Sequence, residues 1–423
     1  MKASLYNWIV EADGHTVIFN GATGCMAEIE ERLVDSICSI VAASPGSAVD
    51  TSCLEPTICK NLVDGGFLLA DEIDEKEFLR QVLLVPRYSM DISYICVVAT
   101  TRCNFACPYC IQKTEPGEDL RSEVEEKILE MIENTRARHL SLTFYGGEPL
   151  LLSEACCRVS SSARGICERR EIAFHSLLVT NGYLLDKGTA RSLKEAGIER
   201  AQVTIDGNRE FHDLRRVLKN GQRTFERIVR NVIEASEYLP IDIRMNLDSK
   251  LHRTPQAIED VEQAFQSSKN VHLHVSPTRW KDDPDSTTEN MISTCRCFAE
   301  RHLYRTRLEA GIPGCCAVSL GSRVVLPNGD YVLCWDEVGS PHPDYGSILN
   351  SPAPSTSLKS MWMRWDPYIK EPCGSCRYLP TCKGSCPRDW LEEGVPFCEF
   401  GSDEDYFLFI RTNRRLRVEK GRQ

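Results

Sequence analysis

Thr100-Thr101-Arg102-Cys103-Asn104-Phe105-Ala106-Cys107-Pro108-Tyr109-Cys110 is the stretch that decides the fold. It places three cysteines in one loop and no fourth beside them. A cubane iron-sulfur cluster has four irons and normally takes four thiolates, so a trio of cysteines leaves one iron open to another ligand. The alternative is zinc, but tetrahedral zinc sites usually pair Cys-x2-Cys units and need a fourth ligand nearby. The loop therefore predicts an iron-sulfur cluster at which chemistry can happen.

A glycine pair follows the next apolar segment. Residues 139–145 are rich in strand formers and run into Gly146-Gly147-Glu148-Pro149. Glycines at the carboxyl end of a strand let the backbone approach a ligand closely, and a carboxylate there can accept hydrogen bonds from an ammonium group. Such a turn is common in isolation, but its place one strand after the cysteine loop strengthens the prediction of a cofactor site.

Together the two motifs resemble the signature of the radical S-adenosylmethionine (SAM) enzymes, with Tyr109 in the aromatic slot of Cys-x3-Cys-x-aromatic-Cys. The resemblance implies a 4Fe-4S cluster whose open iron binds SAM. An electron from that cluster would cleave SAM to methionine and a 5'-deoxyadenosyl radical, which removes a hydrogen from an unactivated carbon. The residues assigned in this way are Cys103, Cys107 and Cys110 for the cluster and Gly146, Gly147 and Glu148 for the SAM amino group.

The middle of the chain alternates between apolar runs and amphipathic stretches. The expected strands are 92–99, 140–144, 172–179, 201–205, 241–247 and 271–275, and the expected helices include 122–135, 186–196, 224–238 and 254–266. Strand alternating with helix predicts an α/β fold with a parallel sheet and helices outside. We expect a partial (β/α)6 barrel, which builds its site at the carboxyl ends of the strands.

Polar residues follow the third and fourth expected strands, in Thr180-Asn181-Gly182 and Asp206-Gly207. A turn leading into a solvated helix start is the simpler interpretation. The stretch in which Asp-Gly is followed by His-Asp and then Arg resembles the pattern of a radical SAM subgroup. The resemblance implies that Asn181 contacts the ribose of SAM and that Arg216 contacts its carboxylate. It also places Asp206 in the same site. We expect His212 to be a structural hydrogen-bonding group.

The carboxyl-terminal third holds a second series of cysteines, which flank Pro327-Asn328-Gly329-Asp330. Their spacing resembles the SPASM domain, an auxiliary-cluster extension of peptide-modifying radical SAM enzymes. The resemblance therefore implies three 4Fe-4S clusters in all. It assigns Cys373, Cys376, Cys382 and Cys398 to one auxiliary cluster and Cys316, Cys334 and Cys386 to the other.

The resemblance does not assign a fourth ligand to the cluster of Cys316. Cys315 is the first candidate, and Cys295 and Cys297 are further ones. Two neighbouring cysteines rarely suit one cube geometrically, so an iron open to substrate is an alternative. Structural zinc is the alternative for the whole series, because Cys-x2-Cys pairs suit zinc equally well. The upstream trio favours iron.

Composition predicts a cytoplasmic, oxygen-sensitive enzyme. The 423 residues include 21 cysteines, but the amino terminus lacks the charged region and apolar run of a signal peptide. No apolar stretch approaches the roughly 20 residues that span a bilayer. The net charge of -11, with a basic stripe only in the tail 411–422, argues against nucleic acid as a partner.

The amino-terminal region fits neither the barrel nor the cluster domain. We expect a hairpin from 5–10 and 16–20, helices at 28–41, 55–64 and 75–82, and a strand at 66–70. This is a small α+β, winged-helix-like pattern, and peptide-tailoring enzymes often use such an element to bind a leader peptide by strand addition. A packing extension is the alternative. The expected domains are 1–88 for peptide recognition, 89–290 for the radical SAM core and 291–423 for the SPASM domain.

The favoured function is a radical SAM/SPASM maturase that installs a cross-link, a thioether from cysteine to carbon, in a ribosomally synthesised precursor peptide with a leader. An electron donor of the flavodoxin or ferredoxin type is implied. A cyclophane-forming enzyme, which makes a carbon-carbon bond, is an alternative. A formylglycine-generating enzyme is another, but the aspartate expected directly after Cys334 is replaced by Trp335, with Asp336 one place later as a weak candidate base. A non-catalytic iron-sulfur carrier or peptide-binding scaffold would not need Gly-Gly-Glu.

Overall fold

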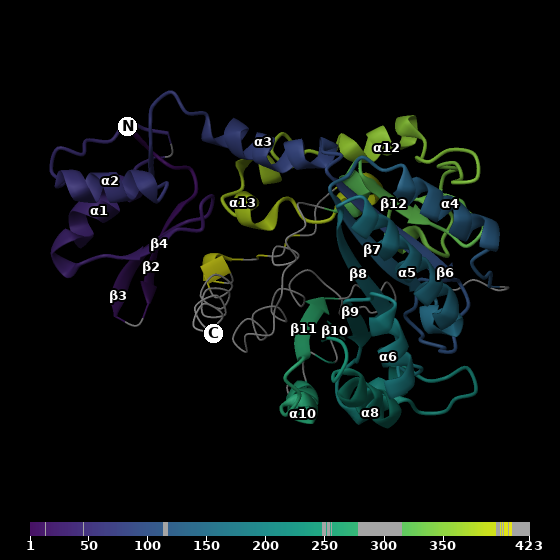
Figure 1. Ribbon diagram of the computed structural model, residues 1–423. Coiled ribbons are helices and arrows are strands. Elements are labelled where there is room, and N and C mark those ends of the chain that lie inside the picture. The colour runs from purple at the N-terminus through teal and green to yellow at the C-terminus, as the bar shows by residue number, and fades with distance from the viewer. Residues whose placement is uncertain are drawn as a thin grey trace. The chain divides into compact units, whose positions relative to one another are not determined.

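The computed structural model describes residues 1–12, 14–44, 46–112, 117–247, 251, 254, 256–277, 315–394, 398, 400, 402–404, 406 and 407. The chain divides into two compact units (Figure 1). One contains Met1–Arg87 and Trp365–Arg411, and the other contains Tyr88–Ala310 and Cys315–Arg364. The expected boundaries at 88 and 290 stay predictions, since compactness alone does not test them.

The second unit is built on an eight-stranded sheet of order β11-β10-β9-β8-β7-β6-β12-β13. Its six central strands are β6 (Ile92–Thr100), β7 (His139–Gly146), β8 (Ala173–Thr180), β9 (Arg200–Thr204), β10 (Ile241–Leu247) and β11 (Val271–Pro277). Each pairs in parallel with its neighbours, as the alternating pattern predicted. β12 (Ser322–Val325) extends the sheet in parallel beside β6, and β13 (Tyr331–Val332) is antiparallel to it. The mostly parallel α/β fold is confirmed, and barrel closure stays a prediction.

Helices connect these strands. They are α4 (Ser122–Glu133), α5 (Ser153–Arg169), α6 (Lys187–Glu195), α7 (Arg209–Arg215), α8 (Phe225–Ala235), α10 (Gln256–Phe265) and α12 (Thr356–Met363). Figure 1 shows α4, α5, α6 and α8 on one side of the strands. In α8 the fully buried residues Ile228, Val232 and Ala235 recur at helical spacing, so one apolar stripe faces the sheet. Asp186 begins α6 by accepting the Thr189 N–H at 2.8 Å. The predicted helices are thus formed.

The amino-terminal part of the first unit is a small α+β assembly. The predicted hairpin forms between β2 (Asn7–Ala12) and β3 (His15–Asn20), and β4 (Met26–Glu28) completes a three-stranded antiparallel sheet. β1 (Lys2–Ala3) pairs with β5 (Leu68–Leu69). Helices α1 (Val34–Val41), α2 (Pro56–Asp64) and α3 (Glu75–Tyr88) follow the order predicted. Ile18, Ile37 and Phe67 lie in its core.

The same unit also contains carboxyl-terminal helices. These are α13 (Leu379–Cys382) and α14 (Pro387–Glu393). Leu79 and Leu83 of α3 pack against Tyr368, Cys373 and Leu379. Trp8 of β2 stacks on Tyr378 with ring centroids 5.4 Å apart. The amino-terminal region and the segment that holds Cys373 therefore pack against each other.

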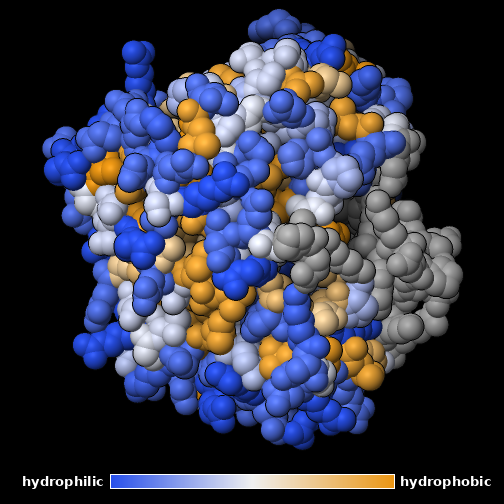
Figure 2. Space-filling model, turned by 90° about the vertical axis from the view of Figure 1, so that its right-hand side faces the viewer, coloured by the Kyte–Doolittle hydropathy of each residue, from blue (hydrophilic) through white to orange (hydrophobic). Residues whose placement is uncertain are grey.

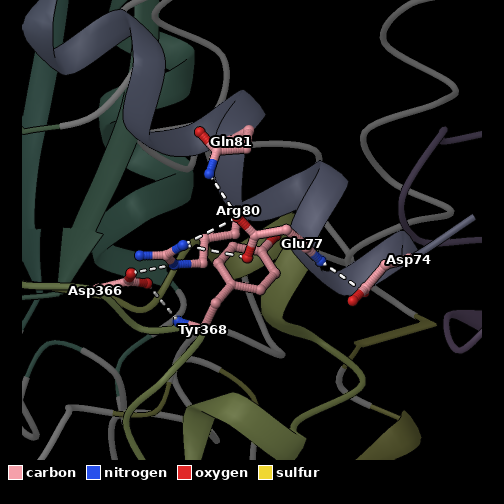
Figure 3. Close-up of polar contacts among 6 residues, drawn as sticks. All are labelled: Asp74, Glu77, Arg80, Gln81, Asp366 and Tyr368. Atoms are coloured by element: carbon pink, nitrogen blue, oxygen red, sulfur yellow. Dashed lines mark hydrogen bonds and ion pairs between the residues drawn. The ribbon is translucent and has the colours of Figure 1, made fainter.

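A polar cluster on α3 completes this packing (Figure 3). Arg80 donates from Nε to the buried Asp366 at 2.5 Å and from Nη1 to Glu77 at 3.1 Å. Asp366 in turn accepts the Tyr368 N–H at 3.0 Å. Because the aspartate joins the α3 guanidinium to the backbone of the cysteine-bearing segment, it ties the two segments together.

Among the described residues no helix is both long and apolar enough to cross a membrane. Hydrophilic residues cover most of the face in Figure 2, with smaller hydrophobic groups between them.

Candidate active site

The cysteine loop leaves the carboxyl end of β6 and is held by a second backbone segment. Ala106 N–H donates to the Val217 carbonyl at 2.9 Å, and Lys219 N–H donates to the Asn104 carbonyl at 2.9 Å. The buried Phe105 lies between these two bonds and pairs as an isolated bridge with Leu218. The loop is therefore fixed by main-chain hydrogen bonds in its first half, where Cys103 lies.

Gly146 and Gly147 make the close backbone approach that their sequence predicted, but the partner is the cysteine loop. A Cβ on Gly146 would lie 2.2 Å from the Thr100 carbonyl oxygen, and one on Gly147 would lie 2.2 Å from the Arg102 carbonyl oxygen. Gly146 also has φ 129°, which side chains rarely adopt. Gly147 N–H and Glu148 N–H donate to those same two carbonyls at 2.9 Å. The glycine pair thus holds the base of the loop.

Glu148 joins the ends of β7 and β8. Its fully buried carboxylate accepts hydrogen bonds from the Leu150 N–H at 3.0 Å, the Thr180 hydroxyl at 2.6 Å and the Asn181 N–H at 2.7 Å. Burial raises the pKa of this carboxyl above its usual value, and the three donors oppose that rise. A carboxylate has about four acceptor positions, so one is left for a further donor such as an ammonium group.

Tyr109, Asp206 and Arg216 form one buried network. The Tyr109 hydroxyl donates to Asp206, and Arg216 donates from Nη1 to the Tyr109 oxygen at 2.6 Å. Burial raises the pKa of Tyr109 well above its usual value, so the phenol is neutral. The Nε of Arg216 has no hydrogen-bond partner among the described residues. This buried donor fits an added carboxylate, which is the role that the resemblance gives to Arg216.

Asn181 lies beside the loop, as its predicted role requires. Its Nδ2 donates to Asn104 at 2.7 Å and lies 4.0 Å from the Cys103 sulfur. Sequence reasoning missed Asn104, and it also missed the bidentate ion pair of Arg102 with Asp119 at 2.7 and 2.6 Å. An arginine directly before Cys103 was the available signal, but no local pattern names its partner 17 residues away.

His212 is a buried structural group. Its Nδ1 accepts the Asp206 N–H at 3.3 Å, and its Nε2 is 3.1 Å from the Thr224 hydroxyl oxygen. Burial, reinforced by the nearby Arg216 charge, lowers its pKa well below the usual value. The neutral ring therefore holds the Asp206 backbone and does not exchange protons in the site.

The three loop thiols are half-buried and suit a soft metal cluster. Burial raises the pKa of Cys103 to about 11 and also raises the pKa of Cys107, where Arg216 acts in the opposite direction. Thiols become thiolates only with a metal or a cation nearby in such surroundings. In the parts of the chain that are described, no three His, Cys, Asp or Glu side chains form a group that could hold a single metal ion.

Cys315, Cys316 and Cys334 lie close together in the second unit. The neighbouring Cys315 thiol, burial and the charge of Cys334 together raise the pKa of Cys316 well above its usual value. Glu337 accepts the backbone N–H of Cys334 at 2.8 Å and so fixes that cysteine. The buried Cys96 of β6 also contributes to the Cys316 shift, although sequence reasoning left Cys96 unassigned. Its place in an apolar strand gave no signal.

The remaining auxiliary cysteines belong to the first unit. The pKa of Cys373 rises to about 11 through burial and then through Cys376 and Cys398, so these three lie near one another. Cys382 accepts the Gly384 N–H at 3.3 Å. Cys386 is in this unit, whereas Cys316 and Cys334 are in the other, so their predicted shared cluster stays a prediction. Cys295 and Cys297 lie outside the described residues.

Comparison with known proteins gives a family match for the middle of the chain. Residues 97–261 match the model of the radical SAM superfamily. The matched segment resembles a radical SAM domain. This domain spans the cysteine loop, Gly146, Gly147, Glu148 and Arg216, and it indicates an enzyme that carries out radical chemistry with a 4Fe-4S cluster and SAM.

Curated relatives of the radical SAM domain are GTP 3',8-cyclases. The protein of Pelotomaculum thermopropionicum is 38% identical over 127 residues, which are 28% of this chain and 36% of that one. The protein of Helicobacter pylori strain HPAG1 is 27% identical over 202 residues, which are 46% of this chain and 57% of that one. The matches thus span between about a third and somewhat over half of these relatives.

Solved structures with the same fold cover more of the chain. Native anSMEcpe with bound AdoMet has a TM-score of 0.60 at 19% identity, over 78% of this chain and 100% of that one. Streptococcus suis SuiB bound to precursor peptide SuiA has a TM-score of 0.52 at 12% identity, over 95% of this chain and 99% of that one. These likenesses concern the fold.

Proposed function

We propose that this protein is a peptide maturase that installs a thioether cross-link in a ribosomally made precursor. The observation that carries the proposal is the extent of the fold. The likeness to SuiB, described in complex with a precursor peptide, runs through 95% of the chain and includes both compact units. The carboxyl-terminal cysteine series, which lies beyond the radical SAM match at 97–261, supports the same function.

In this proposal, the chain's own residues bind and orient the cluster and SAM and shield the site from water. Cys103, Cys107 and Cys110 would hold the SAM-binding cluster, Glu148 the amino group of SAM and Arg216 its carboxylate. When bound, the cluster and SAM supply the radical that removes hydrogen from an acceptor carbon. The two buried residues at the base of the site, Glu148 and Asp206, are 0% exposed, so their hydrogen-bond networks keep their geometry without water. An electron donor of the flavodoxin or ferredoxin type would reduce the cluster.

The proposed reaction balances in hydrogen and in electrons. A substrate thiol and a carbon-hydrogen bond become a sulfur-carbon bond, one hydrogen leaves with 5'-deoxyadenosine, and a proton and an electron leave separately. We propose that an auxiliary cluster, held by the carboxyl-terminal cysteines, would accept that electron. The peptide therefore loses a pair of hydrogens for each cross-link.

Mass spectrometry with alkylation tests the bond. A precursor peptide encoded beside this protein is incubated with reduced enzyme and SAM, and the product is alkylated. We expect each lost pair of hydrogens to block one cysteine. If all thiols stay free after the loss, the product is the carbon-carbon cyclophane and the thioether is wrong. If one cysteine becomes an aldehyde, the formylglycine alternative holds, with Asp336 as the candidate base.

The amino-terminal sheet is the proposed binding site for the leader of the precursor. Ile29 N–H donates to the Thr16 carbonyl at 2.9 Å. Hydrogen-bonded and non-bonded pairs alternate along antiparallel strands, so the N–H and C=O groups of Met26 and Glu28 on the β4 edge point away from β3. An extended peptide could add to this edge through main-chain hydrogen bonds.

Proline at the sheet edge tests leader binding better than a deletion does. Removing 1–88 would also remove Leu79 and Leu83, which pack on the segment of Cys373. Met26→Pro instead removes an edge N–H that β3 does not use. We expect calorimetry to show weaker binding of the leader to the full-length variant, with SAM cleavage retained. Unchanged affinity in this variant and in Glu28→Pro would remove β4 as the leader site.

GTP cyclisation is the second candidate function. The 38% identity to a GTP 3',8-cyclase over 127 residues favours it. The same enzyme preparation is therefore incubated with GTP and SAM. A cyclised nucleotide without modification of the peptide would establish this candidate in place of the maturase.

A further inference from the structure

Lys359 is a buried cation beside a cysteine site. It lies on α12 with 3% of its surface exposed. Its Nζ donates to the Ser322 carbonyl at 2.6 Å and to the Leu320 carbonyl at 3.4 Å. Leu320 lies between the short helical turn Cys316–Val318 and β12, and Ser322 is the first residue of β12. The ammonium group thus lies under the backbone that follows Cys316.

A second cation, Arg323, lies near Lys359. Arg323 donates from Nε to the Pro352 carbonyl at 2.8 Å and from Nη1 to the Gly321 carbonyl at 3.1 Å. Burial, with the positive charge of Arg323 acting in the same direction, lowers the pKa of Lys359 to about 7. Burial also lowers the pKa of Arg323. Arg323 is half-buried, and its positive charge repels that of the buried Lys359.

No carboxylate within the described parts of the chain forms an ion pair with either cation. Buried lysine and arginine side chains are normally paired with an anion, because their desolvation is costly. Only the Cys316 thiolate acts in the opposite direction on Lys359 and favours its charged form. The Lys359 ammonium group is therefore held beside the segment that follows Cys316, without a carboxylate partner among the described residues.

We propose that Lys359, with Arg323, is the built-in counter-charge of an auxiliary iron-sulfur cluster at Cys315, Cys316 and Cys334, and that it raises the reduction potential of this cluster. A cube held by thiolates carries net negative charge, and net charge sets its potential. A fixed cation nearby stabilises the reduced, more negative state. The cluster would then accept an electron more readily.

This inference rests on the auxiliary cluster of the proposed function but not on its substrate. Iron content tests whether the cluster exists, and the potential tests the role of the lysine. If no peptide is modified but iron content and the shift in potential are as expected, the proposed function is wrong and the role of Lys359 still holds. The two proposals can therefore be tested independently.

The test is a redox titration of full-length, reconstituted Lys359→Met, followed by electron paramagnetic resonance. Methionine keeps the length of the side chain and removes its charge. We expect one auxiliary signal to shift to a more negative midpoint, Lys359→Arg to restore it, and Arg323→Met to shift the same signal. Lys187→Met is the matched control, because Lys187 is an exposed lysine paired with Glu237 at 3.0 Å, and no signal should shift.

A purely structural lysine gives a different result. Lys359→Met would then lower the melting temperature while every midpoint stayed at the wild-type value, and this would overturn the proposal. Loss of about four irons in Lys359→Met that Lys359→Arg restores supports it, because a charge is then needed to load the cluster. Wild-type protein without iron at this site would overturn it as well.

Discussion

The cysteine loop at 103–110 and the carboxyl-terminal cysteines are held in opposite ways. Cys103, Cys107 and Cys110 come from one short loop, which backbone hydrogen bonds from β7 and from residues 217–219 fix in place. The auxiliary cysteines come from separated segments in two units. Cys373 lies in a cluster against which Leu79 and Leu83 of α3 pack, nearly 300 residues earlier in the chain. The first site is therefore one loop held by main-chain hydrogen bonds, and the second depends on side-chain packing between separated segments.

This difference separates the two sites experimentally. A change in the glycine pair at β7 should affect only the first site, and a change in α3 should affect only the auxiliary site of the first unit. The following changes test that separation, beginning with the largest effect.

Replacing Cys103, Cys107 and Cys110 together by alanine should abolish SAM cleavage. Three 4Fe-4S clusters correspond to about twelve irons, so about eight should remain. Iron analysis and chromatography of 5'-deoxyadenosine measure the two effects. A wild-type count near four, with zinc present, would show that the carboxyl-terminal cysteines are structural zinc ligands.

Gly147→Ala should displace the cysteine loop. The new Cβ would lie 2.2 Å from the Arg102 carbonyl oxygen, so the backbone must move, and we expect a loss of about 2 kcal/mol or more in unfolding free energy. About four irons and SAM cleavage should be lost, with the auxiliary signals retained. Gly165→Ala is the matched control, because nothing lies within 4 Å of its Cβ inside α5. Full iron content in Gly147→Ala would contradict the preorganised loop.

Arg80→Met should weaken the packing of α3. It leaves the Asp366 carboxylate buried without its charged donor, which costs roughly 1–3 kcal/mol. We expect lower iron content at the auxiliary site of Cys373 while SAM cleavage continues. Arg32→Met, which removes an exposed pair with Glu30, is the control and should change neither. Equal loss of both clusters after Arg80→Met would remove the distinction between the two sites.

Glu148→Gln should change the pH dependence of stability in the absence of SAM. Burial raises the native pKa of Glu148, so the native state favours the protonated form. The wild type then has a larger free energy of unfolding than the variant. This advantage is fully present below the pKa that Glu148 has in the unfolded chain, and it declines as pH rises through the pKa that Glu148 has in the native state. Denaturant unfolding at several pH values measures this difference. A difference that grows with pH would contradict the direction of the shift.

Much of this architecture was predictable because hydrophobic periodicity is local. The six parallel strands and their helices follow from apolar runs such as 92–99. The spacing of the cysteines at 103–110 indicated an iron-sulfur cluster that binds SAM. The position of Asn181 beside Cys103 followed from the rule that parallel strands end at one edge.

Pairings between distant residues were not predictable. Asp119 holds Arg102, Asp366 holds Arg80, and Lys359 lies by the segment after Cys316 only because of the tertiary fold. The glycine pair was expected to let the backbone approach a ligand, and sequence could not show that the cysteine loop is its close neighbour. Polar partners of this kind have no periodic signal.

The most direct test of the account is the dependence of SAM cleavage on a peptide. Reconstituted, dithionite-reduced enzyme is incubated with SAM, with and without the precursor peptide, and 5'-deoxyadenosine is measured together with the peptide mass. We predict that 5'-deoxyadenosine forms and that the peptide loses a pair of hydrogens for each cross-link. If no 5'-deoxyadenosine appears under either condition, the enzymatic account is contradicted, and the protein is an iron-sulfur carrier or scaffold.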